Sequence, residues 1–209
     1  MVNAQSIRVL SVDDHPLIQE GVGIIINRQA DMSLAGTVSN GREGIEAFRV
    51  LRPDVTLMDL RLPDLSGLDV TIAIRSEFPD ARIIVLTTLE GDIDVQRVLK
   101  AGARGYLLKS MPPQQMLDAI RQVHAGKKYV PSEIAAGLAE HFGDGALSER
   151  ELEVLQQVAA GHRNREIGAK LFIAEETVKV HMKHILDKLN AKDRTQSVAI
   201  AVRRGMIHL

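Results

Sequence analysis

The N-terminal part of the chain alternates short apolar runs with amphipathic stretches, five times in succession. The runs have the length and the β-branched content of buried strands, and the stretches between them carry apolar residues at helical spacing. The candidate strands are Arg8–Asp13, Leu34–Val38, Val55–Asp59, Ile83–Thr87 and Gly105–Leu108. The candidate helices are Leu17–Asn27, Arg42–Leu51, Gly67–Glu77, Asp94–Ala101 and Gln114–His124. Five strand–helix units in a row predict an α/β fold with a doubly wound, five-stranded parallel sheet.

Two of these apolar runs end in carboxylates. Asp13 and Asp14 follow the first run, and Asp59 ends the third. The carboxyl ends of parallel strands line the crevice where ligands bind, so three negative charges share one pocket if the two strands are neighbours. Two unit charges about 4 Å apart repel by about 4 kcal/mol at an effective dielectric constant of 20. Because Mg²⁺ prefers oxygen ligands, the sequence predicts a magnesium site at this edge.

The fourth and fifth strands bring a hydroxyl and an ammonium group to the same edge. Thr87 ends the fourth strand and Lys109 follows the fifth. A carboxylate can attack phosphorus and form an acyl phosphate, while a cation and a lysine neutralise the phosphoryl oxygens. An aspartate is already ionised at pH 7, so this chemistry needs no separate general base. The pattern favours phosphoryl transfer.

The bulk composition excludes several classes of protein. The 209 residues include no cysteine, so disulfides and thiolate metal sites are excluded, and a reducing, cytoplasmic location is expected. No apolar run reaches about 18 residues and no secretory h-region begins the chain, so we expect no membrane partner. Aromatic residues make up only 3%, which argues against base stacking on single strands. The first 126 residues carry a net charge of −3 and the remainder +2, which suits two domains with different partners.

After Gly126 the strand pattern stops and the helical period takes over. Residues 127–146 resemble a linker, with a short helix expected over Ser132–Phe142 and a flexible joint at residues 143–145. A capping box of Ser148 and Glu151 then begins a helix that ends at Gly161. Further helices are expected over Asn164–Leu171, Glu175–Leu189 and Thr195–Arg204. The last part of the chain is therefore predicted to be an all-α domain.

Two of these helices, joined by a tight turn, fit a helix-turn-helix. The buried stripe of the second helix is expected to consist of Val178, Met182, Ile185 and Leu189. Lys179, Val180 and Lys183 lie off that stripe, on the exposed face. Lysine suits the guanine acceptors of the major groove, and valine suits a thymine methyl. His181 and His184 have a metal-like spacing, but no further ligand is evident, and a lysine pair on a helix is also typical of a solvated face.

Roughly residues 6–125 resemble the receiver domain of two-component response regulators. The resemblance rests on Asp13-Asp14, Met58-Asp59, Thr87 and Lys109-Ser110, five separated positions that match in order. It implies a flavodoxin-like fold in which Asp59 is the phosphoacceptor and Lys109 binds the phosphoryl group. It also implies that Mg²⁺ is held by the carboxylates of Asp13, Asp14 and Asp59 and the backbone carbonyl of Arg61. Thr87 and Tyr106 would form the switch pair, although taken singly a strand-end threonine and a core tyrosine are unremarkable.

Residues 145–209 resemble the LuxR-type DNA-binding domain, a four-helix helix-turn-helix domain. The matching segments are Leu147–Leu155, Thr177–His181 and Lys188-Leu189. By this resemblance Lys179, Val180 and Lys183 read bases, while Thr177, His181 and Arg165 contact or position phosphates. The helix over Thr195–Arg204 would carry the dimer contact. One departure is Ala174, where the family usually has Ser or Thr. Losing this N-cap costs about 1 kcal/mol.

Together the two resemblances predict a transcriptional response regulator of the NarL/FixJ type. The expected domains are a receiver over residues 1–126, a linker over 127–146 and a DNA-binding domain over 147–209. Mg²⁺-dependent phosphorylation of Asp59 would switch binding to double-stranded DNA with inverted half-sites, as a homodimer. The expected phosphodonor is a sensor histidine kinase. The chain is not expected to be an enzyme beyond slow self-dephosphorylation.

Two other functions remain open at this point. Acid clusters with a nucleophilic aspartate and a lysine also occur in Mg²⁺-dependent phosphatases, although such enzymes use a second acid just after the nucleophile, where this chain has Leu60 and Arg61. The third possibility is a DNA-binding regulator whose front half senses a small molecule or partner without phosphate.

Overall fold

The computed structural model describes residues 6–88, 92–132, 134–135 and 147–207. The chain divides into two compact units, Met1–Thr88 with Val95–Ser132 and Leu89–Asp94 with Glu133–Leu209. Most of the short helix expected over Ser132–Phe142, and the joint at residues 143–145, lie outside the described residues.

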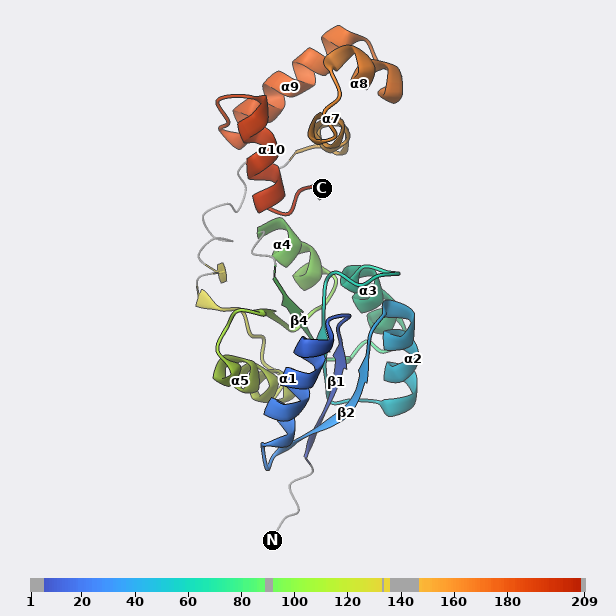
Figure 1. Cartoon of the computed structure of the whole chain (residues 1–209), viewed down its shortest axis with the longest axis vertical. Helices are drawn as coiled ribbons and strands as arrows, with labels where there is room; N and C mark the ends of the chain where they lie inside the picture. The colour runs from blue at the N-terminus through green and yellow to red at the C-terminus, as the bar shows by residue number, and fades with distance from the viewer. Residues whose placement is uncertain (1–5, 89–91, 133, 136–146, 208–209) are drawn as a thin grey trace. The chain divides into compact units, whose positions relative to one another are not determined.

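The first unit is built on a parallel sheet of five strands (Figure 1). The strands are β1 (Ile7–Val12), β2 (Met32–Val38), β3 (Val55–Met58), β4 (Ile83–Thr87) and β5 (Gly105–Leu108). Their spatial order is β2-β1-β3-β4-β5, and every pair is parallel. This is the doubly wound order of a flavodoxin-like fold, so the predicted fold class is confirmed.

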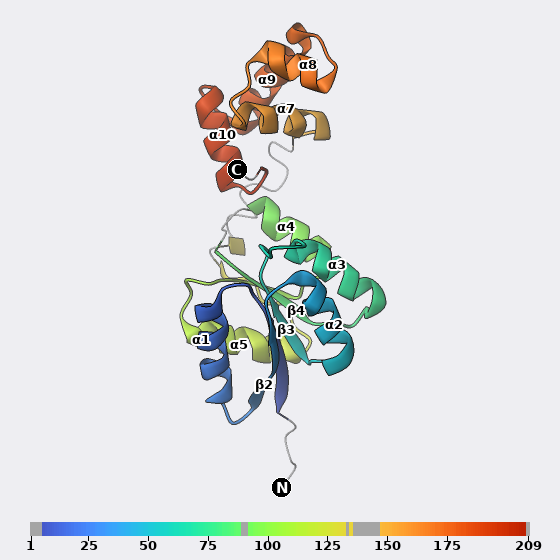
Figure 2. The ribbon, with the colours of Figure 1, turned by 45° about the vertical axis from the view of Figure 1, so that its right-hand side comes forward.

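Five helices accompany the sheet. They are α1 (Pro16–Asn27), α2 (Gly41–Leu51), α3 (Gly67–Glu77), α4 (Asp92–Lys100) and α5 (Pro113–His124). Figure 2 shows α1 and α5 on one face of the sheet and α2 and α3 on the other. On one face, Val22 of α1 and Ile120 of α5 pack with Leu57 of β3. On the other face, Phe48 of α2 and Ile74 of α3 pack in a second apolar cluster. β1, β3, β4 and β5 are buried on both sides, which explains why they appear in the sequence as continuous apolar runs, whereas the edge strand β2 is mostly half-buried.

The strand order brings the acidic strand ends together. β1 lies beside β3, with Val12 paired with Met58 at the carboxyl ends. The next residues along the two strands are Asp13 and Asp59, and the Asp59 N–H donates a 2.8 Å hydrogen bond to the Val12 carbonyl. The two strands are central in the sheet, so these aspartates emerge at the switch point of the fold.

The second unit is helical. Its helices are α7 (Glu149–Ala159), α8 (Asn164–Leu171), α9 (Glu175–Leu189) and α10 (Arg194–Arg203). The predicted stripe on α9 is buried, with Val178 and Ile185 fully inaccessible, and it packs on Leu155 of α7 and Ile167 of α8. Phe172 adopts the left-handed conformation, with φ of 56°, and turns the chain sharply between α8 and α9. This is a helix-turn-helix, as the sequence predicts.

Among the described residues, no helix is both long enough and apolar enough to span a membrane.

Candidate functional site

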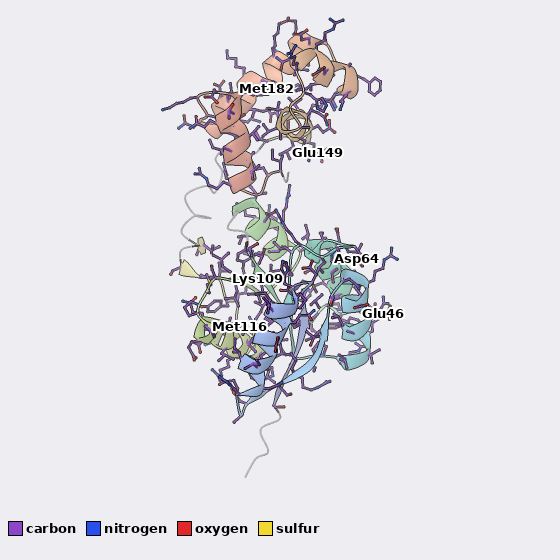
Figure 3. The ribbon with its side chains drawn as sticks, viewed as in Figure 1. Glu46, Asp64, Lys109, Met116, Glu149 and Met182 are labelled. Carbon is purple, nitrogen blue, oxygen red and sulfur yellow. The ribbon has the colours of Figure 1, made fainter. Side chains whose placement is uncertain are left out.

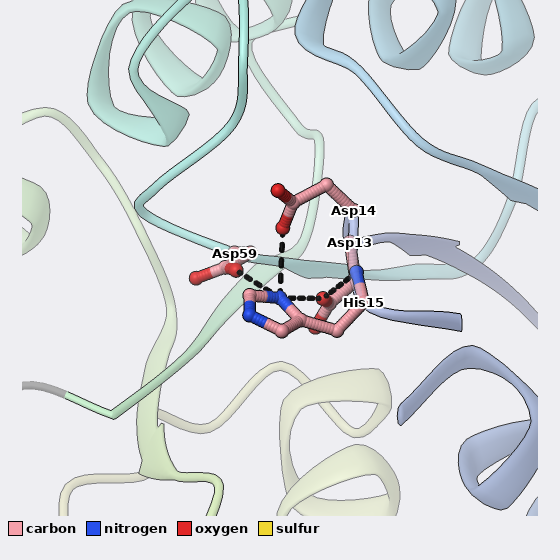
Figure 4. Close-up of side chains that lie close together, drawn as sticks. All are labelled: Asp13, Asp14, His15 and Asp59. Carbon is pink, nitrogen blue, oxygen red and sulfur yellow. Dashed lines mark hydrogen bonds and ion pairs between the residues drawn. The ribbon is translucent and has the colours of Figure 1, made fainter. Parts of the chain in front are cut away.

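The carboxylates of Asp13 and Asp59 are buried at the carboxyl edge of the sheet, with 2% and 3% of their surface exposed. Asp14 lies beside them but is exposed. Ligand oxygens from all three, together with a nitrogen of His15, lie within 4.8 Å of one another (Figure 4). The prediction that two strand ends assemble one acidic pocket agrees with this placement.

Lys109, labelled in Figure 3, supplies the pocket with a buried cation. It follows β5, and its side chain is 6% exposed. Its Nζ donates a 2.7 Å hydrogen bond to Asp59 Oδ2 and lies 2.8 Å from Asp13 Oδ2. The backbone anchors it, since the Lys109 N–H donates to the Thr87 carbonyl at 2.7 Å. One ammonium group is therefore shared between two buried carboxylates.

Burial and the shared lysine shift the proton affinities in this pocket. Burial raises the pKa of Asp59 above its ordinary value, and the negative charge of Asp13 adds to this, while Lys109 and the Arg61 N–H act in the opposite direction. For Lys109, burial favours the neutral amine, but its contacts with Asp13 and Asp59 prevail and raise its pKa. Lys109 therefore remains an ammonium group, and Asp59 holds its negative charge less easily than a solvated aspartate.

The loop after β3 is held in a shape that presents its backbone to the pocket. The Arg61 N–H lies 3.3 Å from Asp59 Oδ1, and Arg61 forms an isolated bridge with Ser66. Gly67 passes so close that a Cβ there would lie 1.9 Å from the Asp59 carbonyl oxygen, so only glycine fits. Asp64 accepts hydrogen bonds from the N–H groups of Gly41 and Arg42, at 2.7 and 3.0 Å, which ties the loop to the start of α2. The residue that the resemblance assigns as a carbonyl ligand, Arg61, thus lies in a rigid turn beside Asp59.

The predicted switch pair lies in β4 and β5, two adjacent strands at one side of the sheet. Thr87 ends β4 with 1% of its surface exposed, and Tyr106 in β5 is fully buried. In the register of β4 and β5, Thr87 pairs with Leu108 and Val85 pairs with Tyr106. Since side chains two residues apart point to the same face, Thr87 and Tyr106 share one face of the sheet. Thr87 lies at the carboxyl end of β4, and Tyr106 lies on the neighbouring strand, level with Val85 and therefore further from that edge.

The donor set suits a divalent cation. Three carboxylates and one ammonium leave a net charge of −2, and the buried Asp13 Oδ2 accepts no hydrogen bond from the described residues, with only the ion pair to Lys109. Oxygen ligands of this kind fit Mg²⁺. The residues immediately after Asp59, Leu60 and Arg61, carry no second carboxylate of the kind a phosphatase uses.

His15 is the residue of this cluster that the sequence reasoning missed. Its Nδ1 lies 2.8 Å from Asp14 Oδ1 and 3.1 Å from Asp13 Oδ1 (Figure 4). The available signal was its position directly after the acidic pair, at the N-cap of α1.

The helical unit presents the predicted DNA-contacting residues at its surface. Arg165 on α8 and Thr177, Lys179, Val180 and Lys183 on α9 are exposed, and His181 is half-buried. His184, one turn after Val180, is also exposed, and its Nδ1 lies 4.0 Å from Glu151 Oε1. Within the described parts of the chain, neither His181 nor His184 belongs to a metal-like cluster, since the acidic pocket supplies the one group found.

The first turn of α9 carries its own negative charges. Ala174 is the N-cap and provides no side-chain hydrogen bond, as its residue type predicts. Glu175 and Glu176 occupy the first turn, where carboxylates interact favourably with the helix dipole. Lys179 Nζ lies 2.7 Å from Glu176 Oε1 and 3.9 Å from Glu175 Oε1. One of the predicted base-reading lysines is therefore paired within its own helix.

Two families of known domains match the chain. The response regulator receiver domain matches residues 9–121, and the luxR family of bacterial regulatory proteins matches residues 145–201. These two matches correspond to the sheet-containing unit and the helical unit.

Full-length relatives share both parts. The chain is 40% identical to the uncharacterized transcriptional regulatory protein YxjL of Bacillus subtilis, with 99% of this chain and 100% of the relative covered. It is 39% identical to the transcriptional regulatory protein LiaR of the same organism, with 97% and 100% covered. Among solved structures, RcsB of Salmonella enterica serovar Typhimurium bound to promoter P1flhDC with phosphomimetic BeF3⁻ is similar, with a TM-score of 0.75, 26% identity and 94% and 98% covered.

Proposed function

The chain belongs to the two-component response regulators of the NarL/FixJ type, which join a receiver domain to a LuxR-type DNA-binding domain, and from this premise we propose that Mg²⁺-dependent phosphorylation of Asp59 controls its DNA binding. The observation that carries the proposal is the pocket itself, where buried Asp59 lies 2.7 Å from the ammonium group of buried Lys109. The phosphodonor is the phosphohistidine of a sensor kinase.

In this reaction a carboxylate oxygen of Asp59 attacks the phosphorus atom of the donor. A P–O bond forms, the P–N bond to the donor imidazole breaks, and its electron pair remains on the imidazole nitrogen, which takes a proton. Lys109 Nζ lies beside the attacking carboxylate and stabilises the charge of the phosphoryl oxygens. The product is an acyl phosphate on Asp59. The chain accepts one phosphoryl group and at most loses it slowly to water.

Asp13, Asp14 and Asp59, with the backbone carbonyl of Arg61, are the groups that would hold Mg²⁺. When bound, the ion neutralises charge on the phosphoryl oxygens and on the clustered carboxylates. Asp13 and Asp59 are already fixed by Lys109, so the chain keeps its acids in place without relying on the cation alone.

Thr87 and Tyr106 carry the change away from the pocket. The Thr87 hydroxyl donates to a phosphoryl oxygen at the edge of the sheet, and the space it leaves is taken by the Tyr106 ring on the same face. The buried positions of both residues on adjacent strands support this coupling. The fold-wide result is a shift between two states of the receiver.

The readout is DNA binding by α9. Lys179, Val180 and Lys183 contact base edges in the major groove, and Arg165, Thr177 and His181 contact or position phosphates. Apolar residues Val198 and Val202 of α10 line an open groove with Val158 of α7, which suits a contact between two copies. A homodimer on inverted half-sites follows from two-fold symmetry. We assign the receiver to residues 1–126, the linker to 127–146 and the DNA-binding domain to 147–209.

The test compares DNA binding with and without a small phosphodonor and Mg²⁺. DNA sequences are first selected from a random pool with phosphodonor-treated protein, and binding to the selected site is then measured by fluorescence anisotropy. Phosphodonor treatment is expected to tighten binding by the parent protein and to have no effect on Asp59→Asn.

The matched control is Asp80→Asn, which removes a carboxylate from an exposed turn of the same unit. It should respond to phosphodonor as the parent does. A phosphodonor response in Asp59→Asn equal to that of the parent would contradict the proposed switch.

A further inference from the structure

His15 places an imidazole nitrogen against the carboxylates of the acidic pocket. Its Nδ1 lies 2.8 Å from Asp14 Oδ1, 3.1 Å from Asp13 Oδ1 and 3.9 Å from Asp59 Oδ2 (Figure 4). Its side chain is 60% exposed, so the ring covers the solvent side of a pocket whose floor is buried. The nitrogen and the three carboxylates supply four ligand atoms that lie within 4.8 Å of one another.

The backbone holds this imidazole in place. The His15 N–H donates a 2.9 Å hydrogen bond to Asp13 Oδ1, and His15 is the extended N-cap residue of α1. Pro16 follows at the first helical position, where its ring restricts the chain. Gln19, one turn into α1, donates to the Asp13 carbonyl and fixes the start of the helix against the end of β1. The position of the ring over the pocket is therefore a property of the strand–helix junction.

The charge of the pocket leaves room for a divalent cation. Asp13, Asp14 and Asp59 contribute three negative charges, and Lys109 compensates one of them. The Asp13 side chain is 3% exposed, and among the described residues its Oδ2 has only the ion pair with Lys109 Nζ, at 2.8 Å. A buried oxygen of this kind gains most from a further cation nearby.

We propose that His15 Nδ1 is a metal ligand, which gives this pocket a mixed nitrogen and oxygen donor set and a preference for first-row transition cations over Mg²⁺. Mg²⁺ binds oxygen ligands and retains its waters, whereas imidazole suits later first-row cations such as Ni²⁺, Cu²⁺ and Zn²⁺, and the affinity of such a site generally rises from Mn²⁺ through Co²⁺ to Cu²⁺. The same pocket therefore serves phosphoryl transfer with Mg²⁺ and also responds to transition cations. The inference rests on the proposed function only for the location of the Mg²⁺ site.

The experiment measures cation selectivity in the full-length protein and in His15→Gln. Co²⁺ is titrated and followed by its visible d–d absorption, which reports nitrogen ligation, and Mg²⁺ is titrated by calorimetry. We expect His15→Gln to weaken Co²⁺ binding by at least about tenfold and to change Mg²⁺ binding by less than about twofold. With ¹⁵N-labelled histidine, Zn²⁺ should shift the Nδ1 resonance of His15 in the parent protein.

The matched control is His124→Gln, at the last turn of α5, which runs away from the carboxyl edge of the sheet. It should bind both cations as the parent does. Circular dichroism checks that His15→Gln is folded, as expected for an exposed side chain.

Two outcomes overturn the inference: an equal effect of His15→Gln on Co²⁺ and Mg²⁺, or no Zn²⁺-dependent shift at His15 Nδ1. If either occurs while Mg²⁺ still supports phosphorylation, the proposed function stands without this metal site. If Co²⁺ binds through His15 but Asp59 is never phosphorylated, the inference stands and the proposed function fails.

Discussion

Each unit contains a buried carboxylate paired with a lysine at the same distance, yet the two pairs have opposite electrostatic character. Asp59 and Lys109 are 2.7 Å apart in the receiver, and Glu151 and Lys188 are 2.7 Å apart in the helical unit. Both carboxylates are almost completely buried. The pKa of Asp59 is nevertheless raised, whereas that of Glu151 is lowered.

The two carboxylates differ in how strongly burial acts on them, more for Asp59 than for Glu151, and in how well each is satisfied. Burial raises the pKa of both groups, but Glu151 also accepts a 2.7 Å hydrogen bond from the Ser148 N–H in the capping box, as well as the contact with Lys188. Asp59 has a distant backbone donor, the Arg61 N–H at 3.3 Å, and it shares its lysine with Asp13. Glu151 is typical of a structural ion pair, and Asp59 is typical of a carboxylate held for chemistry.

Replacing Lys109 or Lys188 one at a time should distinguish the reactive pair from the structural pair most strongly. Lys109→Met is expected to slow phosphorylation of Asp59 by about 100-fold or more, because the fixed positive charge beside the phosphoryl oxygens is lost. Mg²⁺ binding should be retained or tighter, because the three carboxylates then lack a competing cation. Phosphodonor labelling followed by mass spectrometry measures the rate.

Lys188→Met is the matched control in the helical unit. It should leave the rate of phosphorylation unchanged. A normal labelling rate in Lys109→Met would show that Lys109 has no part in the reaction.

Neutralising Glu151 should destabilise the helical unit. In Glu151→Gln the contact with Lys188 and the acceptor for the Ser148 N–H are weakened, and the free energy of unfolding is expected to fall by about 2 kcal/mol. Hydrogen exchange of the α7 and α9 amides reports this for the helical unit alone. Glu153→Gln, whose 49% exposed carboxylate pairs with Arg150, should cost at most about 0.5 kcal/mol. Equal losses in the two variants would remove the distinction between the buried and the exposed pair.

In acid, the two pairs should also change the free energy of unfolding with pH in opposite directions. The lowered pKa of Glu151 means that its stabilisation is present above its ordinary pKa of 4.5 and is lost as the pH falls through the folded-state value. The raised pKa of Asp59 has the reverse sign: in metal-free buffer the receiver loses stability as the pH rises from 3.8, the ordinary pKa of aspartate, through the folded-state value.

Urea unfolding resolves the receiver, because Tyr106 and Tyr129 both lie in it and report its unfolding by fluorescence. Hydrogen exchange resolves the helical unit. Asp59→Asn and Glu151→Gln should each flatten the profile of their own unit. A receiver profile with the same slope in the parent and in Asp59→Asn would contradict the raised pKa.

A third pair, Glu176 and Lys179, has the same 2.7 Å separation but is exposed to solvent, so it shows what an ion pair contributes without burial. Both side chains are exposed, so Glu176→Gln should lower the free energy of unfolding by at most about 1 kcal/mol, through loss of a weak ion pair and of a favourable interaction with the helix dipole. It should tighten DNA binding about twofold to threefold, because Lys179 is released from its intrahelical partner and one negative charge near the phosphates is removed. Anisotropy at two salt concentrations measures this, with Asp187→Asn, near the other end of α9, as the control. Weaker binding by Glu176→Gln would instead indicate that Glu176 itself contacts the DNA.

The local pattern of the sequence was sufficient for most of the architecture. The strands Ile83–Thr87 and Gly105–Leu108, and the helices Asn164–Leu171 and Glu175–Leu189, have the boundaries that periodicity predicts. The helix Gly67–Glu77 also matches, and the remaining described elements differ by one or two residues at an end, as where α1 begins at Pro16 and α10 at Arg194. The acidic pocket was also predictable, because parallel strands end at one edge and the acids follow those ends.

The tertiary structure alone decided which groups meet and how strongly they interact. The sharing of Lys109 between Asp13 and Asp59, the placement of the His15 ring over the pocket and the pairing of Glu151 with Lys188 depend on strand order and helix packing. Hydrophobic periodicity is a local property, whereas burial and charge–charge distances arise only when segments far apart in the chain are packed together. For this reason the sequence by itself placed the aspartates at the strand ends, and the fold determined that the pKa of the buried Asp59 carboxyl is raised while that of the buried Glu151 carboxyl is lowered.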